Sequence, residues 1–194
     1  MALEQAILGF LSDGPATGYE LKTRCFDGAP RLFWTADQAQ VYRTLDRLQR
    51  AGLVRSTRRR QQTRPDRKIY ELTDPGRSVL RAWVCGSHKA PDYRDPFLLQ
   101  LYLATDVADE ALCSVLASQR EVHQQRLDDA RAQISALVGD TSSVSRTMTL
   151  RRCALDAVAA HERAVIDWID DCLDLLEAGG IPPARRPNTE ERPS

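Results

Sequence analysis

The chain has 194 residues, 28% of them charged, with 27 lysines and arginines against 27 aspartates and glutamates. This length can bury a core without disulfides or metals, as one large domain or two small ones. The zero net charge would exclude a nucleic-acid partner only if the charges were evenly spread. Residues 1–90 hold 16 basic and 9 acidic side chains, a balance of +7, whereas residues 91–194 hold 11 and 18, a balance of −7. The N-terminal half alone is therefore predicted to meet a polyanion.

Cysteine usage and hydropathy predict the compartment. The five cysteines are an odd number with no CxxC pair, which favours free thiols in a reducing cytoplasm over a secreted disulfide framework. The apolar N-terminal stretch lacks a basic region and a cleavage site and stops at Gly14-Pro15, so it predicts a core helix and not a signal peptide. The sequence offers no run of about 18 apolar residues for a membrane span. We expect a cytoplasmic protein.

Two short helices are expected first. Apolar residues at helical spacing predict a helix over 2–12, which the turn at 13–15 ends. Thr17 is expected to cap a second helix, which the irregular segment 27–30 interrupts.

A third helix carries signals at both ends. Thr35 is expected to cap it, because Gln38 completes a Thr-x-x-Gln capping box. Gly52 stands where a left-handed C-terminal residue is expected. The apolar stripe of this helix is Val41, Tyr42, Leu45 and Leu48.

After the third helix the sequence pattern changes from helical to strand-like. Residues 53–58 and 68–73 have the β-branched and aromatic content of two short strands, separated by the polar segment 61–66. This pattern predicts a hairpin with a basic tip. Thr73 followed by Pro75 predicts the start of another helix.

Long helices are expected from residue 91. Apolar residues cluster over 96–104, a heptad-like stripe follows from 106 to 138, and a further helix is predicted over 144–178. The predicted organisation is a DNA-binding domain at 1–90, an all-helical dimerisation domain at 91–180 and a disordered tail at 181–194. The fold class is mainly α, with three helices and a two-stranded β wing at the N-terminus.

Three helices followed by a hairpin is the order of a winged helix-turn-helix, in which the third helix enters the major groove. With Leu45 facing inward, the opposite face of the third helix is predicted to carry Ala36, Gln40, Arg43 and Arg47. Glutamine can pair with adenine, arginine with guanine, and a methyl group can touch thymine. We expect Gln40, Arg43 and Arg47 to read bases.

The predicted wing is strongly cationic. A run of arginines taken alone is equally consistent with a solvated surface, but next to a recognition helix it favours phosphate binding with release of counterions. The expected phosphate-binding residues are Arg58, Arg59, Arg60, Arg64, Arg67 and Lys68.

Six segments together resemble one family, the PadR-like transcriptional regulators, in the branch with a long helical C-terminal half. They cover most of residues 3–85, and their order and spacing are jointly specific. The segments are AILGFL (6–11), GYEL (18–21), VYRTLDRL (41–48), AGLV (51–54), RPDRKIYELT (64–73) and PGR (75–77).

The resemblance implies a winged-helix homodimer, usually a repressor, that binds a pseudo-palindromic operator on double-stranded DNA and is often released by a small phenolic or drug-like effector. The family often has glycine near the wing tip, where this chain has Thr63. The C-terminal half matches only as paired amphipathic helices, so its effector chemistry does not carry over. No cofactor is expected.

Several aromatic and histidine positions have two readings. Tyr19 and Tyr42 can reach phosphate, but core packing with the hydroxyl at the surface is favoured. Trp83 and Trp168 can line a ligand pocket, but interface or core packing is favoured because both lie on apolar stripes. The pairs His123 with Glu121 and His161 with Glu162 are interpreted as helix-surface residues and not as a metal site.

No catalytic motif stands in the sequence: we find no Gly-x-Ser-x-Gly, P-loop or Rossmann glycine pattern, so no enzyme is predicted. The competing hypothesis is a protein-interaction scaffold that reuses a winged helix with a coiled-coil arm. The arginines of the third helix and wing disfavour it, because a protein-binding winged helix does not need them.

Overall fold

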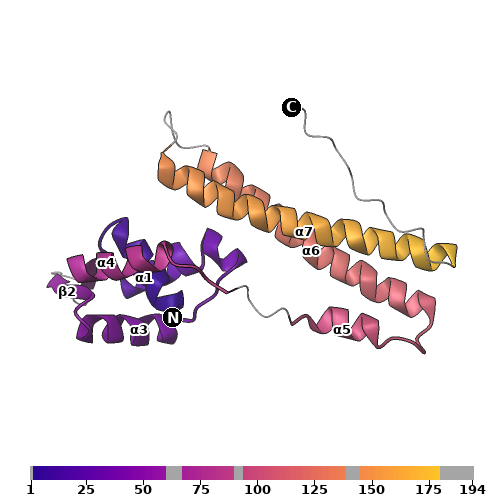
Figure 1. The fold of residues 1–194 in the computed structure, drawn as a ribbon, viewed down its shortest axis with the longest axis horizontal. Coiled ribbons are helices and arrows are strands. Elements are labelled where there is room, and N and C mark those ends of the chain that lie inside the picture. Colours follow the sequence, from indigo (N-terminus) through magenta and orange to yellow (C-terminus); the bar gives the residue numbers. More distant parts are fainter. Residues whose placement is uncertain (1, 60–66, 90–93, 139–144, 180–194) are drawn as a thin grey trace. The chain divides into compact units, whose positions relative to one another are not determined.

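The computed structural model describes residues 2–59, 67–89, 94–138 and 145–179. The chain forms two compact units, Met1–Asp92 and Tyr93–Ser194 (Figure 1). Helices dominate both units, and the small antiparallel sheet lies in the first, which confirms the predicted fold class. The predicted tail at 181–194 lies outside the described residues. In the described part of the chain no helix is long and apolar enough to cross a bilayer.

The first unit follows the predicted order with additions. Its elements are α1 (Ala2–Ser12), β1 (Ala16–Thr17), α2 (Gly18–Glu20), η1 (Leu21–Phe26), η2 (Ala29–Leu32), α3 (Gln38–Arg50), β2 (Val54–Arg59), β3 (Arg67–Leu72) and α4 (Asp74–Val84). The hairpin of β2 and β3 gains a third strand, because β1 pairs with β3 through Ala16 opposite Tyr70 and Thr17 opposite Ile69. A two-residue strand carries no alternating pattern, so the sequence could not reveal it.

Side-chain caps set the helix starts. The Thr17 hydroxyl accepts from the Glu20 amide, and the Glu20 carboxylate accepts from the Thr17 amide, as a capping box. The predicted Thr35 cap is wrong: α3 begins two residues later, where Asp37 Oδ1 accepts from the Gln40 amide at 2.7 Å and Gln40 Oε1 accepts from the Asp37 amide at 3.0 Å. Aspartate is the stronger N-cap residue, so it wins over the nearby threonine.

The predicted end of the third helix and the predicted start of the helix after the hairpin are both confirmed. Gly52 has φ of +70°, the left-handed conformation expected after α3. Thr73 caps α4 by accepting from the Gly76 amide at 3.2 Å, with proline at the start of the helix.

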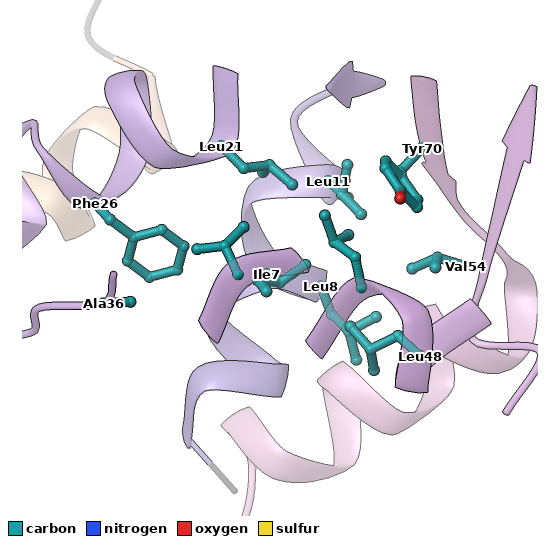
Figure 2. Close-up of a cluster of buried hydrophobic side chains, with 11 residues drawn as sticks. Ile7, Leu8, Leu11, Leu21, Phe26, Ala36, Leu48, Val54 and Tyr70 are labelled. Atoms are coloured by element: carbon teal, nitrogen blue, oxygen red, sulfur yellow. The ribbon is translucent and has the colours of Figure 1, made fainter. Parts of the chain in front are cut away.

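One apolar cluster holds the first unit together (Figure 2). α1 contributes Ile7, Leu8 and Leu11, α3 buries its inner face against them, and the sheet closes the cluster with Val54 and Tyr70. Ala36 is only 7% exposed and belongs to this cluster, so its predicted place on the outer face of the third helix is wrong. The reason is that Ala36 precedes α3 and does not follow its helical period.

The second unit consists of α5 (Pro96–Tyr102), α6 (Asp109–Val138) and α7 (Arg146–Ala178). α6 and α7 pack along each other as an antiparallel pair, with Leu116 and Leu127 of α6 and Leu155 and Ile169 of α7 buried. Ser145 caps α7, and Gly179 ends it in the left-handed conformation at φ +64°. Phe97 of α5 meets the Trp168 ring edge to face, with centroids 6.1 Å apart.

Gly76 allows the first turn of α4 to approach the backbone that leaves α3. A Cβ at this position would lie 2.1 Å from the Leu53 carbonyl oxygen and 2.8 Å from Leu72 Cδ1. The Thr73 hydroxyl donates to the same Leu53 carbonyl at 2.9 Å, so the backbone there is held and cannot move aside easily.

We expect Gly76→Ala to lower the free energy of unfolding by about 1–3 kcal/mol, because overpacking outweighs the better helix propensity of alanine. Urea unfolding of the variant beside Ser78→Ala, at an exposed position of the same helix, measures the difference. A Gly76→Ala protein as stable as the control would contradict this account of the contact.

Candidate nucleic-acid interface

α3 presents one buried and one exposed face. Val41, Leu45 and Leu48 are buried, as the predicted apolar stripe requires. The fourth predicted member of that stripe, Tyr42, is wrong, because it is exposed and Thr44 is buried in its place. The residues on its exposed surface are mostly polar or charged: Gln38, Gln40, Tyr42, Arg43, Asp46, Arg47, Gln49 and Arg50. The outer face is therefore available to a partner along the length of the helix.

The three predicted base-reading residues differ in their surroundings. Gln40 uses its side-chain oxygen in the capping box of α3. Arg47 Nε lies 2.5 Å from Oε1 of Glu4, which ties α3 to α1. Arg43 is exposed and has no hydrogen bond or ion pair with another residue of the described ranges. Of the two arginines, Arg43 is therefore the one whose charge is not engaged by another described residue.

The hairpin places like charges opposite each other. In the register of β2 and β3, the side chain of Arg58 lies opposite that of Lys68, and the backbone of residue 59 pairs with that of Arg67. Directly opposed like charges destabilise a strand pair. The structure therefore concentrates positive charge at this end of the hairpin at some cost to its own stability. The remaining predicted wing residues, Arg60 and Arg64, lie outside the described residues, as does Thr63.

Two polar contacts join the hairpin to α3. Lys68 Nζ lies 3.6 Å from Asp46 Oδ1, and the Ser56 hydroxyl donates to Gln49 Oε1 at 3.1 Å. Asp46, Gln49, Arg50 and Lys68 line a shallow pocket between the two elements. The cationic strands and the exposed face of α3 thus belong to one continuous surface.

The tyrosines lie closer to solvent than expected. Tyr19 is 63% exposed, so its predicted core packing is wrong, because it lies on the outer side of the short helix that Thr17 caps. Tyr42 is partly exposed on α3 and its ring packs on Gly18, where a Cβ would lie 2.5 Å from Cε1. Both hydroxyl-bearing rings therefore border the exposed side of α2 and α3.

The two tryptophans make local ring contacts. Trp83 is exposed on α4, so core packing is wrong for it, and its ring centroid lies 4.7 Å from that of His88. Trp168 is half-buried against Phe97 within the second unit, which agrees with the packing role favoured for it.

Glu162 is 1% exposed, so its interpretation as a helix-surface residue is wrong. It lies on α7, and its carboxylate contacts two side chains of α6. Oε1 accepts from Nε of Arg126 at 2.7 Å, and Oε2 lies 2.5 Å from Nδ1 of His123. A buried carboxylate needs such partners because desolvation penalises its charge. A sequence signal for this contact exists, because His123 and Glu162 each interrupt an otherwise apolar stripe of their helix.

A second polar contact joins the same helices. Arg120 donates twice to the Asp170 carboxylate, from Nε at 2.6 Å and Nη2 at 3.1 Å. The guanidinium holds the pKa of Asp170 below its ordinary value by hydrogen bonding, against a small opposing effect of burial. Among the described residues no group of three or more histidine, cysteine, aspartate or glutamate side chains is placed to hold a metal ion.

The first unit is a winged helix-turn-helix and the second is a helical hairpin. This combination of domains defines a class of transcriptional regulators. The family model described as "Transcriptional regulator PadR-like family" matches residues 7–82, and "Virulence activator alpha C-term" matches residues 93–177. A probable transcriptional regulator of Mycobacterium tuberculosis, Rv1176c, is 31% identical and aligns over 91% of this chain and 98% of its own length. This chain belongs to the PadR-like family of transcriptional regulators.

Solved structures agree in fold. Bacillus subtilis PadR, a negative transcriptional regulator 25% identical in sequence over 90% of this chain, has been solved with operator DNA and with p-coumaric acid. Its operator complex covers 89% of this chain and 97% of that one, with a TM-score of 0.81 and 24% identity. The Vibrio cholerae virulence activator AphA has a TM-score of 0.72 and 27% identity, covering 92% of this chain and 99% of that one. These relatives are transcriptional regulators and not enzymes.

We expect Glu162→Gln to lower the free energy of unfolding by about 1.5–3 kcal/mol, because the neutral amide cannot replace the carboxylate that His123 and Arg126 contact. Glu121→Gln, at an exposed position of α6, removes the same charge and serves as the control. Denaturant unfolding at neutral pH compares the two. Equal stability of both variants would show that the buried cluster does not stabilise the pair of helices.

Proposed function

We propose that this regulator is a repressor that binds a pseudo-palindromic operator as a homodimer, with α3 in the major groove and the hairpin on the phosphate backbone. The observation that supports it best is the pair of opposed cations Arg58 and Lys68, which the register of β2 and β3 places directly across from each other. A neighbouring phosphate would relieve their repulsion and release counterions, so both effects would increase the affinity for DNA.

Arg43 is the residue we assign to base reading first. It is exposed near the middle of α3 and is not committed to an internal ion pair with the described residues. An arginine there can donate twice to O6 and N7 of guanine. Gln40 and Arg47 would join it after giving up, or sharing, their contacts with Asp37 and Glu4. Arg58, Arg59, Arg60, Arg64, Arg67 and Lys68 would hold phosphates without reading sequence.

We also infer a homodimer through the second unit. A monomeric winged helix reads only one half-site. Within the described residues, several large apolar side chains of α5 to α7 and their connections face solvent: Leu99, Tyr102, Leu103, Val107, Val122 and Leu150. A second copy of the chain would bury such residues. A small aromatic effector is proposed from the likeness to the Bacillus protein solved with p-coumaric acid. Action on chromosomal DNA, together with cysteines that form no disulfide, favours the cytoplasm.

Genomic selection with the purified chain, at a stated salt concentration, tests the proposal as a whole. We expect recovery of a pseudo-palindrome whose half-sites lie about one helical turn apart. Recovery of random fragments alone, with binding lost near physiological salt, would overturn sequence-specific repression.

Arg43→Ala is expected to reduce the preference for operator over scrambled duplex by about 5- to 150-fold, the loss of about 1–3 kcal/mol of base discrimination. Gel-shift titration of both duplexes measures the ratio. Arg81→Ala, which removes the same charge from an exposed position on α4, should leave the ratio unchanged.

Arg58→Ala serves as the contrast in the same titrations. It should weaken operator and scrambled DNA alike and reduce the slope of log affinity against log salt by about 1, because one phosphate contact is lost. An Arg43→Ala protein that behaves like Arg58→Ala would contradict the assignment of α3 as the base-reading element.

Light scattering at micromolar concentration tests the oligomeric state. We expect a mass near twice the chain mass of 21.8 kDa. Replacing Leu99 and Leu103 together by glutamate should shift the protein towards monomer, because two charges would be placed in the apolar surface formed by α5 and its C-cap. A wild-type protein that is strictly monomeric would overturn the dimer.

A further inference from the structure

An acidic residue stands in the middle of the basic surface. Asp46 lies on the exposed side of α3 between Arg43 and Arg50, where a carboxylate repels a phosphate backbone. Its side chain is 62% exposed, so it is not buried there by packing. An acid at this place reduces the affinity of α3 for any polyanion, and the fold does not require it for its core.

Asp46 also engages a wing cation. Lys68 Nζ lies 3.6 Å from Asp46 Oδ1 and 4.9 Å from the centroid of the Tyr70 ring, while the Lys68 side chain remains 39% exposed. Hydrogen bonding to Tyr70 raises the pKa of Lys68, and the charge of Asp46 adds to this effect against the opposing effect of burial. Lys68 is thus held at the α3 side of the hairpin, although Arg58 stands directly opposite it.

The position of this pair favours a role in DNA discrimination over one in stability. A single exposed ion pair contributes little to folding, and the hairpin is also joined to α3 by Ser56 and Gln49. The pair lines the shallow pocket between α3 and β3, together with Gln49 and Arg50. A phosphate that approaches this pocket must compete with Asp46 for Lys68.

We propose that Asp46 is a specificity-determining residue: it keeps Lys68 from non-specific phosphates and yields it only to duplexes that offer Asp46 another donor, the exocyclic amino group of a cytosine. A carboxylate on a recognition helix can accept from cytosine N4, which would satisfy Asp46 once Lys68 turns to the backbone. Duplexes without a cytosine in reach leave the carboxylate unsatisfied beside phosphates. This inference rests on the proposed function.

Glu71 provides a matched control. Like Asp46, it is an acid paired with a basic side chain, since Arg55 Nη2 lies 2.6 Å from Glu71 Oε2. Side chains alternate along β3, so Glu71 faces the opposite side of the hairpin from Lys68 and Tyr70. Glu71→Gln therefore makes the same change in net charge without touching the contact with α3.

The test measures the binding of a scrambled duplex and of the selected operator across a salt series, for the wild type, Asp46→Asn, Glu71→Gln, Lys68→Gln and the double variant Asp46→Asn/Lys68→Gln. One additional contact between a lysine and a phosphate raises the affinity for DNA about eightfold at 0.1 M salt. It also steepens the slope of log affinity against log salt by about 0.9. We expect this gain on scrambled DNA for Asp46→Asn beyond that of Glu71→Gln, with a smaller gain on the operator. In the Lys68→Gln background the excess over Glu71→Gln should vanish.

The outcomes separate the two proposals. A wild-type chain that binds no duplex even at low salt overturns the proposed function, and this inference with it. A wild-type chain that binds, with Asp46→Asn indistinguishable from Glu71→Gln, overturns only the role of Asp46. An Asp46→Asn effect that persists without Lys68 overturns the competition for the lysine. Thermal unfolding of each variant checks that all remain folded.

Discussion

The first unit depends on the burial of one face of α3 against α1. Leu45 and Val41 are fully buried, and Ile7 and Leu8 of α1 meet that face within the shared cluster (Figure 2). Since helical side chains repeat every 3.6 residues, fixing the inner face also fixes which residues face outward. The exposed arginines of α3 are therefore oriented by apolar packing, and the sheet that closes the same cluster orients the cations of the hairpin.

Charge in this molecule is arranged in two different ways. In the second unit, Glu162 and Asp170 are each matched by cations across α6 and α7, and these contacts set which residues of the two helices lie side by side. The first unit also has matched pairs, such as Arg47 with Glu4 and Arg55 with Glu71, but its hairpin in addition places Arg58 directly opposite Lys68. Paired opposite charges neutralise each other within the fold, whereas opposed like charges produce a positive potential at the surface that attracts an anionic partner.

Strong periodic patterns made much of the fold predictable, since the core of α3, the hairpin and the left-handed Gly52 all follow from local chemistry. Three features did not. β1 is too short to have a period, Asp37 displaced Thr35 because two cap residues only two positions apart compete, and Ala36 entered the core because it lies before the helix whose period was applied to it. For the candidate site, residue types predicted the surface, but the contacts of Gln40 with Asp37 and of Arg47 with Glu4 depend on tertiary geometry and on the true cap. The pairing of Glu162 with His123 likewise spans 39 residues of sequence.

The contact between Arg47 and Glu4 has an evolutionary consequence. A substitution at Arg47 removes a link between α3 and α1, and one at Gln40 removes half of a capping box, so both alter the fold together with the outer face of α3. Arg43 can change without disturbing a contact of either kind. Relatives that keep this framework are therefore expected to diverge first at the position of Arg43, where a new preference can arise without a compensating change elsewhere.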